Sequence, residues 1–436
     1  MLHSRLYPRY VLGLLWAAGV LRFVDLQILA VLLEPIKAEF LLSDTQLALL
    51  GGLAFALLYG GLGIPVAWLA ERYSRRIIIA TAVILWSAMT VLCGQAHSFA
   101  ALFVARVGVG LGEAGGYAPS TSLLADYFPA AKRGRACAVL ASAIPVGVLT
   151  GFIVGGMVAQ HWGWRMAMTV AGAPGLLLGI LIWLTLADPT REKLDQPLPT
   201  RHFIAECHQL WQRPGYAQVL MAACLFTLGA VGSGMWLPSY FIRHHGMDSA
   251  NVGLWMAGLY GVGGLVGSMT GGWLAERFDR DGSGAAYARI SQWSLLLALT
   301  LLPLVLLNPS PVPALCVHFG VTLLMHMNVG PVLTLLQQLG GENQRALAQA
   351  FSVLTSNIVA LPLGPLFIGL CSDHLGALLG TRVIGLAILL LLLLSWSLAA
   401  LMFWSAARQL EHGLLVKKAM VTSGEHALTL LARGSG

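Results

Sequence analysis

The sequence predicts an all-α integral membrane protein with twelve transmembrane helices in two six-helix bundles and with both termini in the cytoplasm. Of its 436 residues, 57% are hydrophobic and only 10% are charged, and the mean hydropathy is +0.76. Soluble domains carry about a quarter charged residues. This chain therefore cannot cover its surface with water-compatible side chains, and its surroundings must be mostly lipid.

Charged or Pro/Gly-rich breaks divide the chain into twelve apolar runs, and a helix needs about 20 residues to cross the hydrocarbon core. The expected spans are 10–34, 46–70, 77–95, 99–126, 136–159, 166–187, 216–242, 251–275, 290–309, 313–339, 347–371 and 383–407. One long polar connector separates six spans from six. The predicted units are therefore a bundle at 1–187, a cytoplasmic linker at 188–215, a second bundle at 216–408 and a cytoplasmic tail at 409–436.

Lysine and arginine decide the orientation, because cytoplasmic loops are enriched in both. With the amino terminus inside, the cytoplasmic segments hold 20 of the 26 Lys and Arg residues. The outer loops hold four, namely Lys37, Arg165, Arg243 and Arg382, and two lie within spans. This bias accounts for the net charge of +7 without any nucleic-acid partner.

A charged hexapeptide occurs once in each half, as WLAERY at 68–73 and as WLAERF at 273–278. Both copies lie at the cytoplasmic end of the second span of their half. A chain of six plus six spans with equivalent elements predicts two parallel repeats related by an axis normal to the membrane.

The first copy and its flanks resemble the loop signature of the major facilitator superfamily. That signature usually has Gly where Ala67 and Ser74 stand and Asp where Glu71 stands, and the second copy restores the first Gly as Gly272. The segments FVDLQILAVLLEPIKAEFLLSDTQLALLGGLAF and RVGVGLGEAGGYAPSTSLLADYFPAAKRGRA look like bacterial members of the spinster branch. The animal relatives in that branch carry lysophospholipids and sphingolipid phosphates, so the resemblance implies a lipid transporter.

Four ionisable residues fall deep within predicted spans, namely Arg22 and Asp25 in the first and Arg106 and Glu113 in the fourth. Each costs about 2.5–3.5 kcal/mol on insertion scales, so such residues are functional candidates by default. Arg106 and Glu113 are seven positions apart, which places them on one helix face two turns apart. We therefore expect Arg106 to adjust the proton affinity of Glu113, and the alternative is that these charges only join helices.

The resemblance to the spinster branch favours proton coupling. In that branch, the acid of the first span and the Glu of the RxGxGxGEA stretch are implicated in proton-linked transport. These match Asp25, Arg106 and Glu113. The branch usually has Arg directly after the first acid, whereas this chain has Leu26 there and Arg22 one turn earlier, on a different face.

The weaker polar candidates are expected to contact substrate or to join helices by hydrogen bonds. His318 and His326 are the deep histidines of the second half, and a histidine near mid-membrane could relay a proton. The residues expected to contact substrate are Arg22, Gln27, Tyr117, Ser120, Trp236, His326, Asn328 and Asn357. Charges in the first half and neutral groups in the second suit an amphiphile better than a sugar.

The hexapeptides are expected to form a cytoplasmic gate. In a six-plus-six arrangement the second span neighbours the eleventh, and the eighth neighbours the fifth, so Glu71 and Glu276 can each face the positive end of a helix. Arg75 or Arg76 is expected to reach Asp126. The predicted gate residues are Glu71, Arg72, Arg75, Arg76, Asp126, Glu276 and Arg277.

The sequence thus predicts a proton-coupled secondary transporter of an amphiphilic lipid in a bacterial inner membrane. Small organic anions or drug-like amphiphiles are alternative substrates, and a non-transporting membrane sensor is an alternative class. No GxxxxGK[ST] loop is present, and the six cysteines form no CxxC. We expect no enzyme activity, cofactor or metal, and the expected partners of a monomer are protons, the amphiphile and the bilayer.

Overall fold

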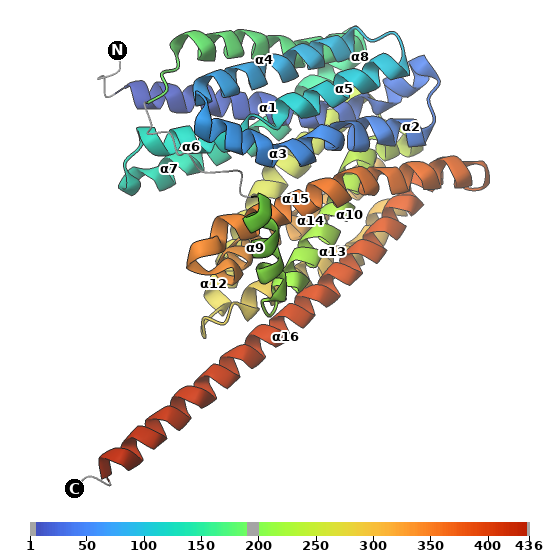
Figure 1. Cartoon of the computed structure of the whole chain (residues 1–436). Coiled ribbons are helices and arrows are strands. Elements are labelled where there is room, and N and C mark those ends of the chain that lie inside the picture. Colours follow the sequence, from blue (N-terminus) through green and yellow to red (C-terminus); the bar gives the residue numbers. More distant parts are fainter. Residues whose placement is uncertain (1–5, 190–199, 434–436) are drawn as a thin grey trace.

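Long helices fill the computed structural model, which describes residues 6–189 and 200–433 (Figure 1). The first half contains α1 Tyr7–Phe40, α2 Asp44–Ala48, η1 Leu49–Leu53, α3 Ala54–Arg72, α4 Arg75–Gly94, α5 Phe99–Glu113, α6 Tyr117–Tyr127, α7 Ala130–Ala141 and α8 Ala143–Thr185. The linker contains α9 Thr200–Gln212. The second half contains α10 Tyr216–His245, α11 Ser249–Met256, η2 Ala257–Gly263, α12 Gly264–Phe278, α13 Ala285–Leu306, α14 Pro311–His326, α15 Val329–Leu379, η3 Gly380–Arg382 and α16 Val383–Arg433.

Ten segments of the described chain are long and apolar enough to cross a membrane, and two of these ten contain two passes each. Lys132–Thr185 reverses direction at Gly163, whose φ is +84°. Leu347–Leu415 reverses at Gly380, whose φ is +57°. Glycine adopts this left-handed backbone without a Cβ clash. The twelve predicted passes are therefore confirmed.

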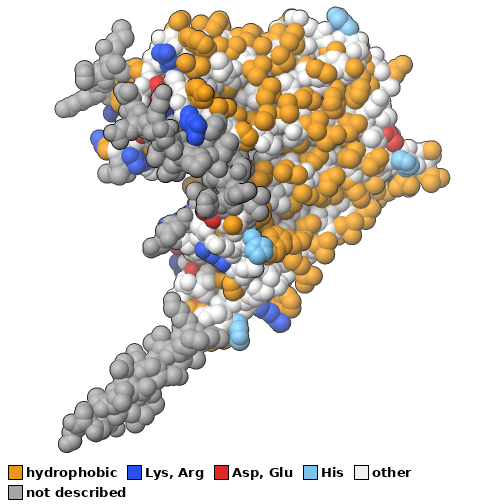
Figure 2. Space-filling model, viewed as in Figure 1, with side chains coloured by type: hydrophobic (Ala, Val, Ile, Leu, Met, Phe, Trp, Pro, Cys, Tyr) orange, Lys and Arg blue, Asp and Glu red, His pale blue; other side chains and the backbone are white. Residues whose placement is uncertain are grey.

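Side-chain chemistry follows the expected membrane orientation. Figure 2 shows hydrophobic side chains across the broad lateral face, whereas Lys and Arg gather near the end where both termini lie. A lateral apolar band with charges at its ends matches the solvent change from hydrocarbon to water.

Three helices extend into regions that the sequence assigned to loops. The first span was expected to end at residue 34, but α1 continues through Pro35 to Phe40. Its terminal charges, Glu34 and Lys37, have partners in the fold and do not end the helix. The linker contains α9, and α16 runs through most of the predicted tail to Arg433.

The two halves meet through equivalent pairs of helices. α1 contacts α10, while α2, η1 and α3 contact α15, and α8 contacts α11 and η2. The halves pack closely at Gly156 and Gly253: a Cβ on Gly253 would lie 2.4 Å from the Phe152 carbonyl oxygen. Larger side chains at these two positions would force the halves apart.

Candidate functional site

The four deep charges lie together in the interior of the first half. α1 supplies Arg22 and Asp25, and α5 supplies Arg106 and Glu113. The side chains of Asp25, Arg106 and Glu113 are at most 2% exposed, whereas that of Arg22 is 11% exposed. Isolated charges are rarely tolerated at such depth, so their pairing decides whether the site is stable.

The ion pairs run between the two helices and not along them. Arg22 Nε donates to Glu113 Oε2 at 2.9 Å, and Arg106 Nη1 donates to Asp25 Oδ2 at 3.3 Å. Arg106 is therefore bonded to Asp25 and not directly to Glu113, and its expected influence on the proton affinity of Glu113 stays a prediction. Helical spacing identifies residues on one face, but each long arginine side chain reaches across to the acid of the other helix.

Two neutral residues that the sequence analysis missed complete this charged site. Arg22 Nη2 donates to the Tyr59 hydroxyl on α3 at 2.5 Å, and Thr90 on α4 donates to Asp25 Oδ1 at 2.7 Å. Tyr and Thr within apolar spans are common, so their residue type gave no signal. Four helices thus contribute a group of six side chains, bonded as two separate sets of three.

The bonding of this group is incomplete. Glu113 Oε1 and Arg106 Nε have no hydrogen-bond partner among the described residues, although both are buried. An acid with one free oxygen can accept a proton there without first losing its arginine contact. The arrangement can therefore hold a proton at Glu113, which leaves the positive charge of Arg22 without its counter-charge.

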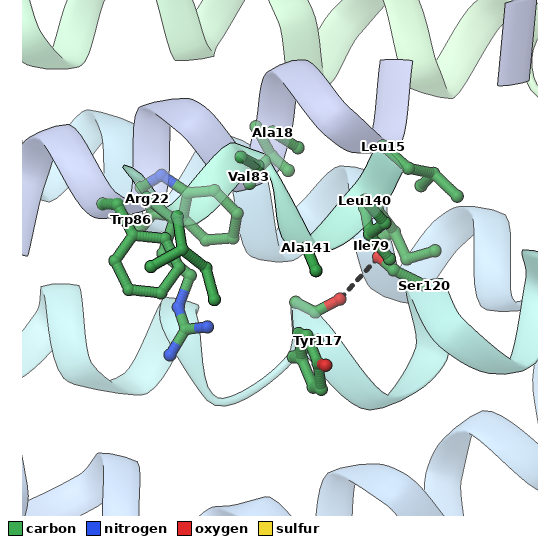
Figure 3. A pocket seen from close by; sticks show the side chains of 15 residues that line it. Leu15, Ala18, Arg22, Ile79, Val83, Trp86, Tyr117, Ser120, Leu140 and Ala141 are labelled. Carbon is green, nitrogen blue, oxygen red and sulfur yellow. Dashed lines mark hydrogen bonds between the residues drawn. The ribbon is translucent and has the colours of Figure 1, made fainter. Parts of the chain in front are cut away.

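An apolar pocket adjoins the Arg22 side chain between α1, α4, α6, α7 and α8 (Figure 3). Its lining residues are Leu15, Ala18, Gly19, Arg22, Phe23, Ile79, Val83, Trp86, Gly116, Tyr117, Ser120, Leu140, Ala141, Ala143 and Ile144. Figure 3 shows Arg22 beside Trp86, with Tyr117 and Ser120 farther along the pocket. The Ser120 hydroxyl already donates to the Gly116 carbonyl oxygen at 2.6 Å. Arg22 is the charged residue of the lining.

The remaining substrate candidates are dispersed. Gln27 lies against Gly151 of α8, and Asn357 lies against Gly60 at the contact of α3 with α15. Trp236 is fully buried and donates to the Pro365 carbonyl at 3.0 Å, so it stabilises the second half and lines no open space.

The two second-half candidates near mid-span lie at a break in the tenth pass. His326 is the last residue of α14, and its Nδ1 lies 2.8 Å from the Thr322 carbonyl oxygen. Asn328 precedes α15 and is fully buried.

Arg75 and Asp126 are joined as an ion pair at 2.6 Å. Arg75 also pairs with Asp188 at 2.9 Å, and its backbone N–H donates to the same carboxylate at 2.6 Å. Asp188 follows α8 at the start of the linker, so this contact fastens the cytoplasmic ends of α4 and α6 to the segment after α8.

The other predicted gate residues are on the cytoplasmic side. Glu276 is exposed, and no hydrogen bond or ion pair joins it to another described residue. Arg277 lies over the Trp273 ring at 5.7 Å, and Arg76 lies within 3.5 Å of the Leu186 carbonyl oxygen. Arg72 ends α3, whereas the side chain of Glu71 lies outside the described residues.

A charged network on the outer side joins the two halves. Arg243 of α10 donates two hydrogen bonds of 2.7 Å to Asp44 and one of 2.8 Å to Glu34. Lys37 adds a bond of 2.5 Å to Asp44. The Asp44 side chain is only 4% exposed, so water screens these contacts weakly.

α15 completes this outer network. Ser372 donates to Asp44 Oδ2 at 2.5 Å. The Asp373 carboxylate accepts the backbone N–H groups of Asp44 and Thr45 at 2.9 and 2.8 Å, which caps the start of α2 across the boundary between the halves. The sequence analysis assigned these residues to loops and missed the network. Together these bonds close the outer side.

Comparisons with known proteins agree with this architecture. The family description "Major Facilitator Superfamily" matches residues 15–361. An MFS-type efflux pump of Mycolicibacterium smegmatis is 30% identical over 92% of this chain and 93% of its own. The sphingosine-1-phosphate transporter SPNS2 of Danio rerio is 27% identical over 84% of this chain and 77% of its own. A crystal structure of a bacterial homolog to human lysosomal transporter Spinster, inward-facing and unoccupied, superposes with a TM-score of 0.82 at 26% identity, covering 94% and 98% of the two chains.

Replacing Asp44 by Asn should open the outer side. Removing one partner of a buried ion pair costs about 3–5 kcal/mol, because the remaining charge stays buried. We expect a cysteine placed at Met235, which packs against Gly51, to react at least ten-fold faster with an impermeant maleimide added outside.

Glu39→Gln is the matched control, because Glu39 pairs with Arg165 on the same outer side but within one half. Its labelling rate should equal that of the parent protein. Equal rates for Asp44→Asn and Glu39→Gln would show that the network does not hold the halves together.

Proposed function

The chain belongs to the Major Facilitator Superfamily, and we propose that it is a proton-coupled transporter of an amphiphilic lipid such as a lysophospholipid. In this proposal a monomer in a bacterial inner membrane works by alternating access. The observation that carries the proposal is the pair of buried acids, Asp25 and Glu113, each bonded to an arginine, of which Arg22 lines an apolar pocket. Transport is the activity of the superfamily, while the coupling and the substrate are our proposals.

Proton coupling follows from the competition between burial and pairing. Burial favours the neutral carboxylic acid, and a neighbouring guanidinium favours the carboxylate. Arg22 lies 2.9 Å from Glu113 and belongs to another helix, so a small movement of α1 relative to α5 changes that balance. One proton moving through 100 mV supplies about 2.3 kcal/mol, which is sufficient for modest accumulation.

An amphiphilic substrate follows from the pocket lining. The pocket presents many apolar side chains and one charged group, Arg22, which is also its link to the acids. Such a lining fits an alkyl chain with an anionic head. The similar zebrafish protein carries a lipid phosphate by name. A drug-like amphiphile is the second candidate, because the similar mycobacterial protein is an efflux pump.

Neutralising either acid should abolish gradient-driven transport. In proteoliposomes with an imposed pH gradient, we expect Asp25→Asn and Glu113→Gln each to lower lysophospholipid flux at least ten-fold, because neither variant can release a proton at that position. Glu411→Gln is the control, since Glu411 is part of an exposed pair with Arg289. Full gradient-driven flux in both acid variants would disprove the coupling. Flux of a drug-like amphiphile with none of lysophospholipid would select the second candidate.

The two hexapeptides are proposed to stabilise the state in which the cytoplasmic side is closed. A carboxylate at a helix amino terminus contributes about 0.3–1 kcal/mol. We therefore expect Glu71→Gln and Glu276→Gln each to increase labelling of a cysteine placed at Ala141, in the pocket lining, by about two- to five-fold. Glu411→Gln again serves as the control, and labelling of both variants at the control rate would refute the gate.

A further inference from the structure

The second half contains buried polar atoms for which the proposed mechanism has no role. Both ring nitrogens of His318 and the hydroxyl of Thr322 have no hydrogen-bond partner among the described residues. Their residues are 5% and 0% exposed. More than 90% of buried polar groups in proteins are bonded, so neighbouring exceptions indicate a place built for a polar ligand group.

These groups face one aromatic side chain at the boundary between the halves. His318, Thr322 and His326 are spaced by four and share one face of α14. The Tyr260 ring of η2 contacts both imidazoles, with ring centres 6.4 Å from His318 and 6.3 Å from His326. Phe152 of the first half stacks on the same Tyr260 ring at 5.8 Å. We call Tyr260, His318, Thr322 and His326 the Tyr260 cluster.

Glycine lets α14 approach the eighth pass closely enough to form the cluster. A Cβ on Gly264 would lie 3.1 Å from His326 Nε2, and one on Gly263 would lie 3.5 Å from Thr322 Cγ2. His326 is only partly buried, and so is Tyr260. The cluster therefore has an accessible side at Tyr260 and His326 and a buried side at His318 and Thr322.

The internal repeat relates this cluster to the charged site of the first half. The fourth pass breaks after Glu113, the last residue of α5, and the tenth breaks after His326, the last residue of α14. The 205-residue offset of the hexapeptides pairs Tyr59 with Gly264. In the first half, the Tyr59 side chain is bonded to Arg22 of the Arg22–Glu113 pair. In the second half, Gly264 has no side chain at the matching position, and the His326 ring lies against it. His326 thus corresponds to Glu113 by its place at the helix end, and His318 corresponds to it by the 205-residue offset.

We infer that the Tyr260 cluster binds the oxyanion of the substrate's head, a phosphate or a carboxylate. Phenol, hydroxyl and imidazole all donate hydrogen bonds, which an oxyanion accepts. The cluster contributes no carboxylate, so a cationic head finds no charged partner in it. This inference rests on the proposed function in taking the substrate to be an amphiphile.

The test compares three ligands with the same alkyl chain, namely dodecyl phosphate, dodecanoate and dodecyltrimethylammonium. Calorimetry on the purified full chain in nanodiscs gives each Kd. We expect the double variant His318→Gln/His326→Gln to raise the Kd of both anions at least ten-fold and that of the cation less than two-fold. His374→Gln is the control, because His374 also lies within 2.9 Å of the carbonyl four residues earlier but is exposed.

A second variant keeps the test decisive if the double variant does not fold. Gly264→Ala should displace His326 and raise the Kd of both anions at least three-fold, whereas Gly272→Ala should have no effect, since a Cβ there meets nothing within 4 Å. Unchanged anion affinity, or an equal loss for all three ligands, would overturn the inference. Flux measurements separate the two proposals. Anion-selective binding without gradient-driven flux would support the binding site and disprove the proposed transport function.

Discussion

The buried pairing of four charges on α1 and α5 is the constraint on which the rest of the structure depends. Arg22, Asp25, Arg106 and Glu113 together carry no net charge when all are ionised, and each acid has an arginine from the other helix. A buried charge that loses its partner is costly, because the surrounding lipid and protein offer no water to replace it. Any movement of α1 relative to α5 must therefore exchange partners, take up a proton or bind a ligand. This requirement makes a charge-neutral core a suitable coupling device.

α1 connects this core to the outer network. Arg22 and Glu34 are twelve residues apart on one continuous helix, which corresponds to about 18 Å along its axis. Arg22, nearer the cytoplasmic side, is bonded to α5, and Glu34, on the outer side, is bonded to Arg243 of the second half. A shift of α1 that lengthens one contact therefore strains the other. The helix continues through Pro35, since its outer charges are bonded across the halves and stabilise the last turn.

Sequence patterns predicted the fold and the position of the charged site, but not its pairings. Span length, the Lys and Arg bias and the repeated hexapeptide are properties of single segments, and they gave twelve passes in two halves. Pairings depend on which helices pack together. Tyr59 and Thr90 give no signal in the sequence, because only the positions of α3 and α4 bring them to Arg22 and Asp25. The outer network was missed because Asp44 and Arg243 look like loop charges in the sequence. Nothing in the sequence places a cap from Asp373 on α2, 328 residues away from Thr45.

The two halves share a backbone plan but differ in charge, and the proposed amphiphilic substrate with an anionic head would account for both conditions. The fourth pass of each half is broken after a polar residue, Glu113 in the first half and His326 in the second, so each half offers a polar side chain at a helix end within the pass. Two acids at these positions would repel an anionic head and would need two arginines to be buried. An acid opposite an imidazole avoids both problems. In the proposed mechanism the first half exchanges protons while the second supplies hydrogen bonds, and only one half needs charges that are costly to insert.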